Sequence, residues 1–141
     1  MIDQNENDVG YLIQQIEHLL GQLFNKNLVK EGLSFSHARV IYLLYANDGM
    51  TQSELQQDLL IKASSITKLI DILVEKGLVK REGCASDARI KRIYLTEAGR
   101  QKERILCRIK EQTEADLLHA LSTSEQQTLV YLLKQVKATL L

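Results

Sequence analysis

The sequence KREGCASDARIKRIYLT, residues 80–96, decides the fold because it combines a turn, a strand pattern and a dense set of basic side chains. Leu78 and Val79 open a first strand, and residues 83–87 are small and polar, as in hairpin loops. Residues 90–95 then alternate in the manner of a return strand. The stretch therefore predicts a β-hairpin with a basic tip and stem.

Charge is distributed unevenly along the chain. Over 141 residues, 18 lysines and arginines balance 18 aspartates and glutamates. Within residues 60–95, however, eight basic side chains face only four acidic ones, Asp71, Glu75, Glu82 and Asp87. Because local charge rather than the total governs phosphate binding, a neutral chain with this segment is compatible with nucleic acid.

Two helices are predicted between residues 34 and 60. The first begins at Ser34 or Ser36 and stops at the turn-forming residues 47–49. Thr51 and Glu54 then have the spacing of a capping box, which opens a short helix that ends near residue 60.

A third helix leads directly into the hairpin. Its core-facing stripe consists of Ile66, Leu69, Ile70, Leu73 and Val74. Gly77 is placed to end it in a left-handed turn. Since only one face is apolar, the other face is free to contact a partner.

Both ends of the chain predict long helices with wide apolar stripes. One covers residues 9–24, and Thr96 is a suitable cap for another that continues past residue 109. Residues 122–125 form a second capping-box pattern that opens the last helix. The stripe of that helix consists of Leu129, Leu132, Leu133, Val136 and Leu140.

These elements predict a single domain over residues 1–141 that is mainly α with a small β-hairpin wing, an α+β fold. We expect a winged helix-turn-helix core, residues 34–96, flanked by N- and C-terminal dimerisation helices, residues 8–31 and 97–141. In a monomer the terminal stripes would expose large apolar patches, so the sequence predicts a homodimer.

Several motifs make the chain resemble the MarR-type transcriptional regulators. They are Thr51-Gln-Ser-Glu-Leu55, Ser65-Ile-Thr-Lys-Leu-Ile-Asp71, Leu73-x-x-x-Gly77-Leu-Val-x-Arg81, Asp87-x-Arg89 and Leu95-Thr96-x-x-Gly99. The resemblance implies a homodimer on a pseudo-palindromic operator of double-stranded DNA. It places the recognition helix in the major groove and Arg89 in the minor groove, with Asp87 holding the arginine.

The residues expected to contact DNA lie on the third helix and the hairpin. They are Ser64, Ser65, Thr67, Lys68, Arg81, Arg89, Lys91 and Arg92. Lys62 and Ala63 stand where the family often has a serine cap and a proline, so the recognition helix is expected to start nearer Ser64.

The resemblance also implies a cleft for a small aromatic or phenolic effector, which would release the DNA from a repressor. The polar and aromatic candidates to line it are Tyr11, His18, His37, Arg39 and Tyr42. Ordinary packing explains each of these residues as well.

Cys84 lies in the basic hairpin, where neighbouring cations would favour its thiolate and so a redox-sensing role. A plain loop cysteine is the alternative. Cys107, beside apolar residues, is expected to react more slowly. A structural disulfide is not expected, since free thiols suit a reducing compartment.

Other function classes find little support. The sequence shows no HExxH, GxSxG or glycine-rich phosphate loop, so we expect neither an enzyme nor a cofactor or metal site. No apolar run approaches the length of a membrane span, and MIDQNEND lacks the pattern of an export signal, which favours the cytoplasm. A winged-helix adaptor that binds an acidic protein remains an alternative.

Overall fold

The computed structural model describes residues 6–141; residues 1–5, part of the segment tested for an export signal, lie outside it. The N-terminal elements are α1 (Val9–Leu28), the 3-10 turn η1 (Val29–Glu31) and α2 (Phe35–Ala46). The central ones are β1 (Met50–Thr51), α3 (Gln52–Leu59), α4 (Ala63–Glu75), β2 (Val79–Cys84) and β3 (Asp87–Leu95). The chain ends with α5 (Glu97–Leu118) and α6 (Thr123–Ala138). The fold is mainly helical with a small antiparallel sheet, as predicted.

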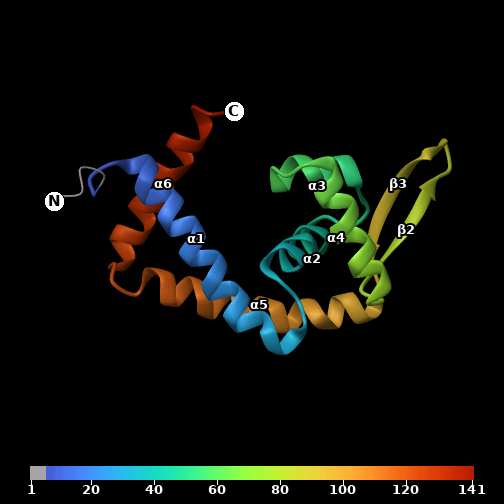
Figure 1. Ribbon diagram of the computed structural model, residues 1–141, viewed down its shortest axis with the longest axis horizontal. Coiled ribbons are helices and arrows are strands. Elements are labelled where there is room, and N and C mark those ends of the chain that lie inside the picture. The colour runs from blue at the N-terminus through green and yellow to red at the C-terminus, as the bar shows by residue number, and fades with distance from the viewer. Residues whose placement is uncertain (1–5) are drawn as a thin grey trace.

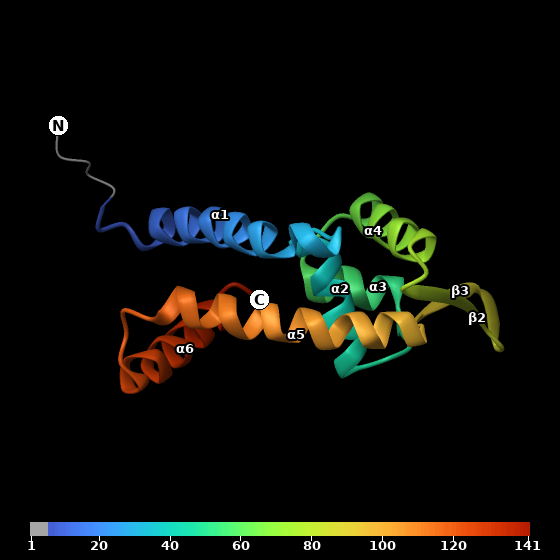
Figure 2. The ribbon, with the colours of Figure 1, turned by 90° about the horizontal axis from the view of Figure 1, so that it is seen from below.

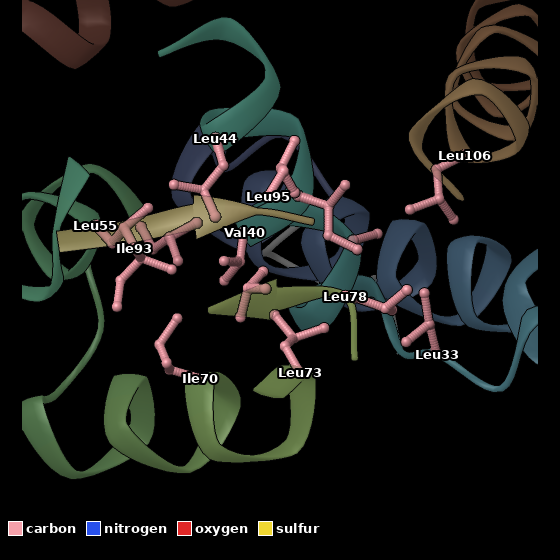
Figure 3. Packing of buried hydrophobic residues seen from close by; sticks show 14 of the residues in the cluster. Leu33, Val40, Leu44, Leu55, Ile70, Leu73, Leu78, Ile93, Leu95 and Leu106 are labelled. Carbon is pink, nitrogen blue, oxygen red and sulfur yellow. The ribbon is translucent and has the colours of Figure 1, made fainter. Parts of the chain in front are cut away.

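The hydrophobic core lies where α2, α3 and α4 pack against the sheet (Figure 3). Leu44, Leu55, Ile70, Leu73 and Ile93 are fully buried there. Each buried side chain of this size stabilises the fold by roughly 1.5–3 kcal/mol. The core thus fixes the two helices of the helix-turn-helix against the base of the hairpin.

One member of the predicted stripe on α4 is not in the core. Val74 is 37% exposed, and Leu69 is only partly buried. Ile66, Ile70 and Leu73 carry the packing of the helix, because they are its buried residues. Gly77 follows with a φ of 73°, the left-handed turn that the sequence predicts.

Local hydrogen bonds explain where the helices begin. The Oγ atoms of Ser34, Thr96 and Ser122 each accept from a backbone N–H three residues on, and the box of Ser122 with Glu125 is complete. Ser34, not Ser36, caps α2. Thr51 accepts from the N–H of Glu54 at 3.1 Å, but the reciprocal bond is not formed, so only half of the expected box is present.

The expected shift of the recognition helix is wrong. The helix α4 begins at Ala63, and Lys62 occupies the N-cap position without a side-chain bond to the helix. The carbonyl of Lys62 still accepts from the N–H groups of Ser65 and Ile66, so the first turn closes without a serine cap.

The hairpin is longer and its loop shorter than the sequence predicts. Strands β2 and β3 leave only residues 85–86 between them, with an irregular register between Gly83 and Cys84. The strand β1, which the sequence did not reveal, pairs with β3 so that Met50 lies opposite Ile93 and Thr51 opposite Arg92. The sheet order is therefore β1-β3-β2.

The terminal helices form an arm that extends away from the winged core. Helix α5 runs from the base of the hairpin to the far end of the molecule (Figure 1). A short turn joins α5 to α6, which runs at an angle to α5 (Figure 1 and Figure 2). The C-terminal part of α1 packs through buried Phe24 and Leu28, whereas α6 has no buried residue.

Two polar contacts join α5 to α1 and to the η1 turn that follows it. Asn27 donates to Thr113 Oγ1 at 3.1 Å, and Lys102 pairs with Glu31 at 3.4 Å. Within residues 6–141, no helix combines the length and apolar character that crossing a bilayer requires.

Candidate nucleic-acid interface

The polar face of the recognition helix α4 presents an exposed serine, an exposed lysine and a threonine that is already bonded. Ser64 and Lys68 are exposed, and Ser65 is partly buried. Thr67 Oγ1 donates to the carbonyl of Ala63 at 3.1 Å and accepts from Gln52 Nε2 at 2.8 Å. Because its only proton is used within the helix, the Thr67 hydroxyl is a weaker candidate for reading bases than the sequence implied.

Gln52 is a residue of this interface that sequence reasoning missed. It lies in the first turn of α3, and its bond to Thr67 joins the two helices of the helix-turn-helix. Its position inside a capping-box pattern concealed this role, because only the tertiary fold shows what the side chain reaches.

Near the tip of the wing, Arg89 presents an exposed guanidinium, and Asp87 holds both its backbone and its side chain. The side chain of Arg89 is 92% exposed, and its Nε lies 3.3 Å from Asp87 Oδ1. Asp87 Oδ1 also accepts from the Arg89 backbone N–H at 2.9 Å. Both bonds lower the pKa of Asp87, and the bond from the Arg89 backbone N–H has the larger effect. The carboxylate therefore holds the arginine fork, as the Asp-x-Arg motif suggests.

The other basic side chains of the hairpin divide into free and bonded groups. Lys91 is exposed, and Lys80 pairs with Glu82 at 3.0 Å. Arg81 pairs with Asp71 of α4, and Arg92 Nη1 donates to the carbonyl of Gly49 at 2.9 Å. The predicted cluster is thus partly an internal network, and Lys68, Arg89 and Lys91 are the members directed at solvent.

A cleft of about 430 Å³ separates the start of α3 from the wing. Its walls are Thr51, Gln52, Ser53, Arg89, Ile90 and Lys91. Two cations and several hydrogen-bonding groups therefore converge between the helix-turn-helix and the hairpin, an arrangement suited to a phosphodiester backbone.

Two of the five predicted effector residues line a cavity. Arg39 and Tyr42 face about 340 Å³ of space between α1, α2, α3 and α5. The Tyr42 hydroxyl donates to the carbonyl of Leu106 at 2.7 Å, and burial raises its pKa to about 12. The Arg39 guanidinium lies 5.5 Å from the ring centroid of Phe35, which stacks on Phe24 at 4.2 Å.

The other three effector candidates do not line this cavity. His18 is exposed and contacts Gln22 at 3.2 Å, and Tyr11 lies near the start of α1. His37 Nδ1 accepts from the N–H of Ser34 at 3.1 Å, within the cap of α2. Burial, and then the charge of Lys76, lowers the pKa of His37. Of the three, His37 serves local structure, because its ring completes the cap of α2.

Cys84 lies at the end of β2, and its pKa is lowered for a reason different from the expected one. The main cause is the Ser86 hydroxyl, 3.1 Å from Sγ, followed by the N–H groups of Ser86 and Asp87; the charge of Arg92 contributes least. Cys107 is also free, and burial raises its pKa. In the described part of the chain, no group of three or more His, Cys, Asp or Glu side chains stands close enough to hold a metal ion.

We predict that Cys84 reacts with iodoacetamide faster than Cys107 at pH 7, because the thiolate is the nucleophile and only Cys84 has a lowered pKa. Mass spectrometry of timed samples measures the two rates. In a Cys84→Ser variant the fast phase should vanish while the slow one persists. Equal rates in the native protein would contradict the hydrogen-bonded thiolate.

Comparison with known proteins agrees with this geometry. The MarR family model matches residues 31–90. The chain is 28% identical over 132 residues to the uncharacterised HTH-type transcriptional regulator YdgJ of Bacillus subtilis, covering 94% of this chain and 79% of that protein.

Two solved complexes with DNA have the same fold. The MepR–DNA complex of S. aureus superposes with a TM-score of 0.87 at 26% identity, covering 95% of this chain and 99% of that one. A cysteine-to-serine mutant of E. coli MarR, complexed with operator DNA, gives 0.86 at 27% identity, covering 94% and 96%.

A winged helix-turn-helix with an exposed wing arginine beside a polar recognition helix defines a DNA-binding transcriptional regulator. Within that class, the chain resembles the MarR family, whose model matches residues 31–90, and it has the fold of E. coli MarR over 94% of its length.

Proposed function

We propose that the protein is a homodimeric repressor that binds a pseudo-palindromic operator in double-stranded DNA. The observation that carries this proposal is Arg89, 92% exposed at the end of a hairpin and held by Asp87. A short hairpin can place a guanidinium in a minor groove too narrow for a helix. The polar face of α4, with Lys68 and Ser64, then lies in the adjacent major groove.

Dimerisation is supported by the apolar surface that the single chain leaves exposed. On α1 this surface comprises Val9, Leu12, Ile13, Ile16 and Leu19, each at least 40% exposed. On α6 it comprises Val130, Leu132, Leu133 and Val136, each at least 42% exposed. Surfaces of this kind on two terminal helices fit a second copy, and two copies present two recognition helices to a two-fold operator.

We expect Arg89→Ala to weaken binding to specific and unspecific DNA together, by about 1–3 kcal/mol per site. The slope of log affinity against log salt should flatten by up to about one unit per subunit, since fewer counterions are released. Fluorescence anisotropy at several salt concentrations measures both quantities.

Arg108→Ala is the matched control for this experiment. It removes the same charge from an exposed position on α5, away from the wing. Native affinity and slope are expected for this control. An Arg89→Ala variant that behaves like Arg108→Ala would show that the wing does not contact DNA.

We further propose that a small aromatic or phenolic ligand in the cavity of Arg39 and Tyr42 releases the DNA. The stacked rings of Phe24 and Phe35 offer an apolar platform, and Arg39 and Lys110 offer cations, opposed by Asp58 and Glu114. Arg39 Nη2 also donates to the carbonyl of Leu59 at 3.2 Å, at the turn between α3 and α4. A ligand that binds Arg39 competes with this bond and so acts on the turn that orients α4.

A panel of benzoates and phenols, titrated into the protein–DNA complex, tests this regulation. At least one compound should lower the anisotropy of the complex formed by the native protein. The same compound should leave the anisotropy of the Arg39→Met complex unchanged. The DNA affinity of Arg39→Met without ligand is measured as a control. If no compound of the panel binds the free protein, or if Arg39→Met responds as the native protein does, the cavity is not the effector site.

A further inference from the structure

Arg92 occupies a different environment from the other basic residues of the wing. It is partly buried on β3, opposite Thr51 of β1 and Glu82 of β2. Its Nη1 donates to the carbonyl of Gly49 at 2.9 Å, in the turn between α2 and β1. The guanidinium is therefore directed toward the base of the winged core, whereas that of Arg89 pairs with the neighbouring Asp87, and the Arg89 side chain is 92% exposed.

The turn that Arg92 contacts is bonded to β3 at successive points. The N–H of Gly49 donates to the carbonyl of Ile93 at 3.0 Å, and the N–H of Leu95 donates to Asp48 Oδ1 at 2.9 Å. Asp48 Oδ2 accepts from Arg100 at 2.8 Å. Gly49 has a φ of 79°, and a Cβ there would lie 2.9 Å from the Tyr94 ring. The turn thus fits against β3 closely, and the Arg92 bond satisfies the carbonyl of Gly49.

The position of this turn governs how the wing and the recognition helix are oriented relative to each other. Only the two residues of β1 separate it from α3, whose N-cap is Thr51. Helix α3 in turn holds α4 through the bond from Gln52 to Thr67. A side chain that fixes β3 to residue 49 therefore fixes the angle between the hairpin and the helix-turn-helix.

We propose that Arg92 is a positioning residue that locks the wing to the helix-turn-helix through the Gly49 carbonyl and does not contact a DNA phosphate. This inference rests on the proposed DNA binding for its effect on affinity, but the lock itself is a property of the free protein. It replaces the expectation from the sequence that Arg92 contacts DNA.

The experiment compares Arg92→Met with Arg89→Met, which remove the same charge from the same strand. The probe is a duplex that covers the region upstream of the protein's own gene. For Arg92→Met we expect affinity to fall about tenfold or more, the effect of one lost hydrogen bond between a charged and a neutral group, while the salt slope stays native. For Arg89→Met the slope should fall by up to about one unit per subunit.

Hydrogen exchange in the free protein gives a readout that is independent of DNA. The Gly49 amide, bonded to Ile93, should exchange about fivefold faster or more in Arg92→Met and at the native rate in Arg89→Met. Arg92→Lys keeps a donor of nearly the same length and should restore most of the protection. If the native protein does not bind DNA, the proposed function is wrong. The exchange result still shows whether Arg92 holds the wing to the turn at Gly49.

Three outcomes would overturn the inference. One is a salt slope that falls in Arg92→Met as it does in Arg89→Met, with native exchange at Gly49, because Arg92 would then be a phosphate contact. Another is native affinity and native exchange in Arg92→Met, because the bond would then position nothing. The third is an Arg92→Lys variant that is as unprotected at Gly49 as Arg92→Met.

Discussion

Gly99→Ala should destabilise the protein by about 3 kcal/mol, at the upper end of the usual cost of overpacking. A Cβ at this position would lie 2.1 Å from the backbone carbonyl oxygen of Leu78 and 3.1 Å from the side chain of Leu95. The carbonyl cannot move freely, because it also accepts from the N–H of Thr96 at 3.1 Å. The start of α5 would therefore have to separate from the base of the hairpin.

Thermal unfolding followed by circular dichroism at one protein concentration measures this effect, and a fall in Tm of roughly 10 °C is expected. Gly21→Ala is the control, since a Cβ there meets nothing within 4 Å. That variant should be neutral or stabilised by about 0.5–1 kcal/mol, because alanine favours a helix interior. A Gly99→Ala variant as stable as the native protein would show that α5 and the hairpin do not approach as closely as described.

Leu133→Glu should convert the dimer to a monomer and lower operator affinity at least about 100-fold, because each monomer would bind only one half-site. Leu133 is 47% exposed in the single chain and belongs to the apolar stripe of α6. Burying a carboxylate in the proposed interface without a partner carries a large desolvation cost. Sedimentation velocity at micromolar concentration gives the mass, and anisotropy gives the affinity.

Gln127→Glu adds the same charge to the opposite side of α6, at an exposed position. This control should remain a dimer with native affinity. A native protein that sediments as a folded monomer, or a Leu133→Glu variant that stays dimeric, would show that the α6 stripe is not the dimer interface.

The sequence predicts the features that depend on neighbouring residues. The caps at Thr96 and Ser122, and the left-handed turn at Gly77, follow from hydrogen bonds and backbone conformations that span only a few positions, whereas for α2 the sequence left Ser34 and Ser36 as alternatives. The pairing of Asp87 with Arg89 is equally local. For this reason the order of the helices and the hairpin could be predicted closely.

Features that depend on distant partners could not be predicted. Strand β1 has only two residues, which is too short for an alternating pattern to be visible in the sequence. It forms because Met50 and Thr51 pair with Ile93 and Arg92 of β3. In the sequence, Arg92 cannot be distinguished from the other wing cations, because its partner Gly49 is 43 positions away. Likewise, the sequence predicts a free hydroxyl at Thr67, because the contact with Gln52 depends on how α3 packs against α4. Placing these side chains required the tertiary fold.

The central claim is that this chain recognises a DNA sequence as a dimer, and a titration of the native protein tests it most directly. A labelled duplex from the region upstream of its own gene is compared, by anisotropy at physiological salt, with a scrambled duplex of the same composition. We expect two chains per duplex, at least about 1,000-fold tighter binding to the upstream duplex, and affinity that falls with salt. Equal binding to the two duplexes, or no binding to either, would contradict the account and favour a winged-helix adaptor for an acidic protein.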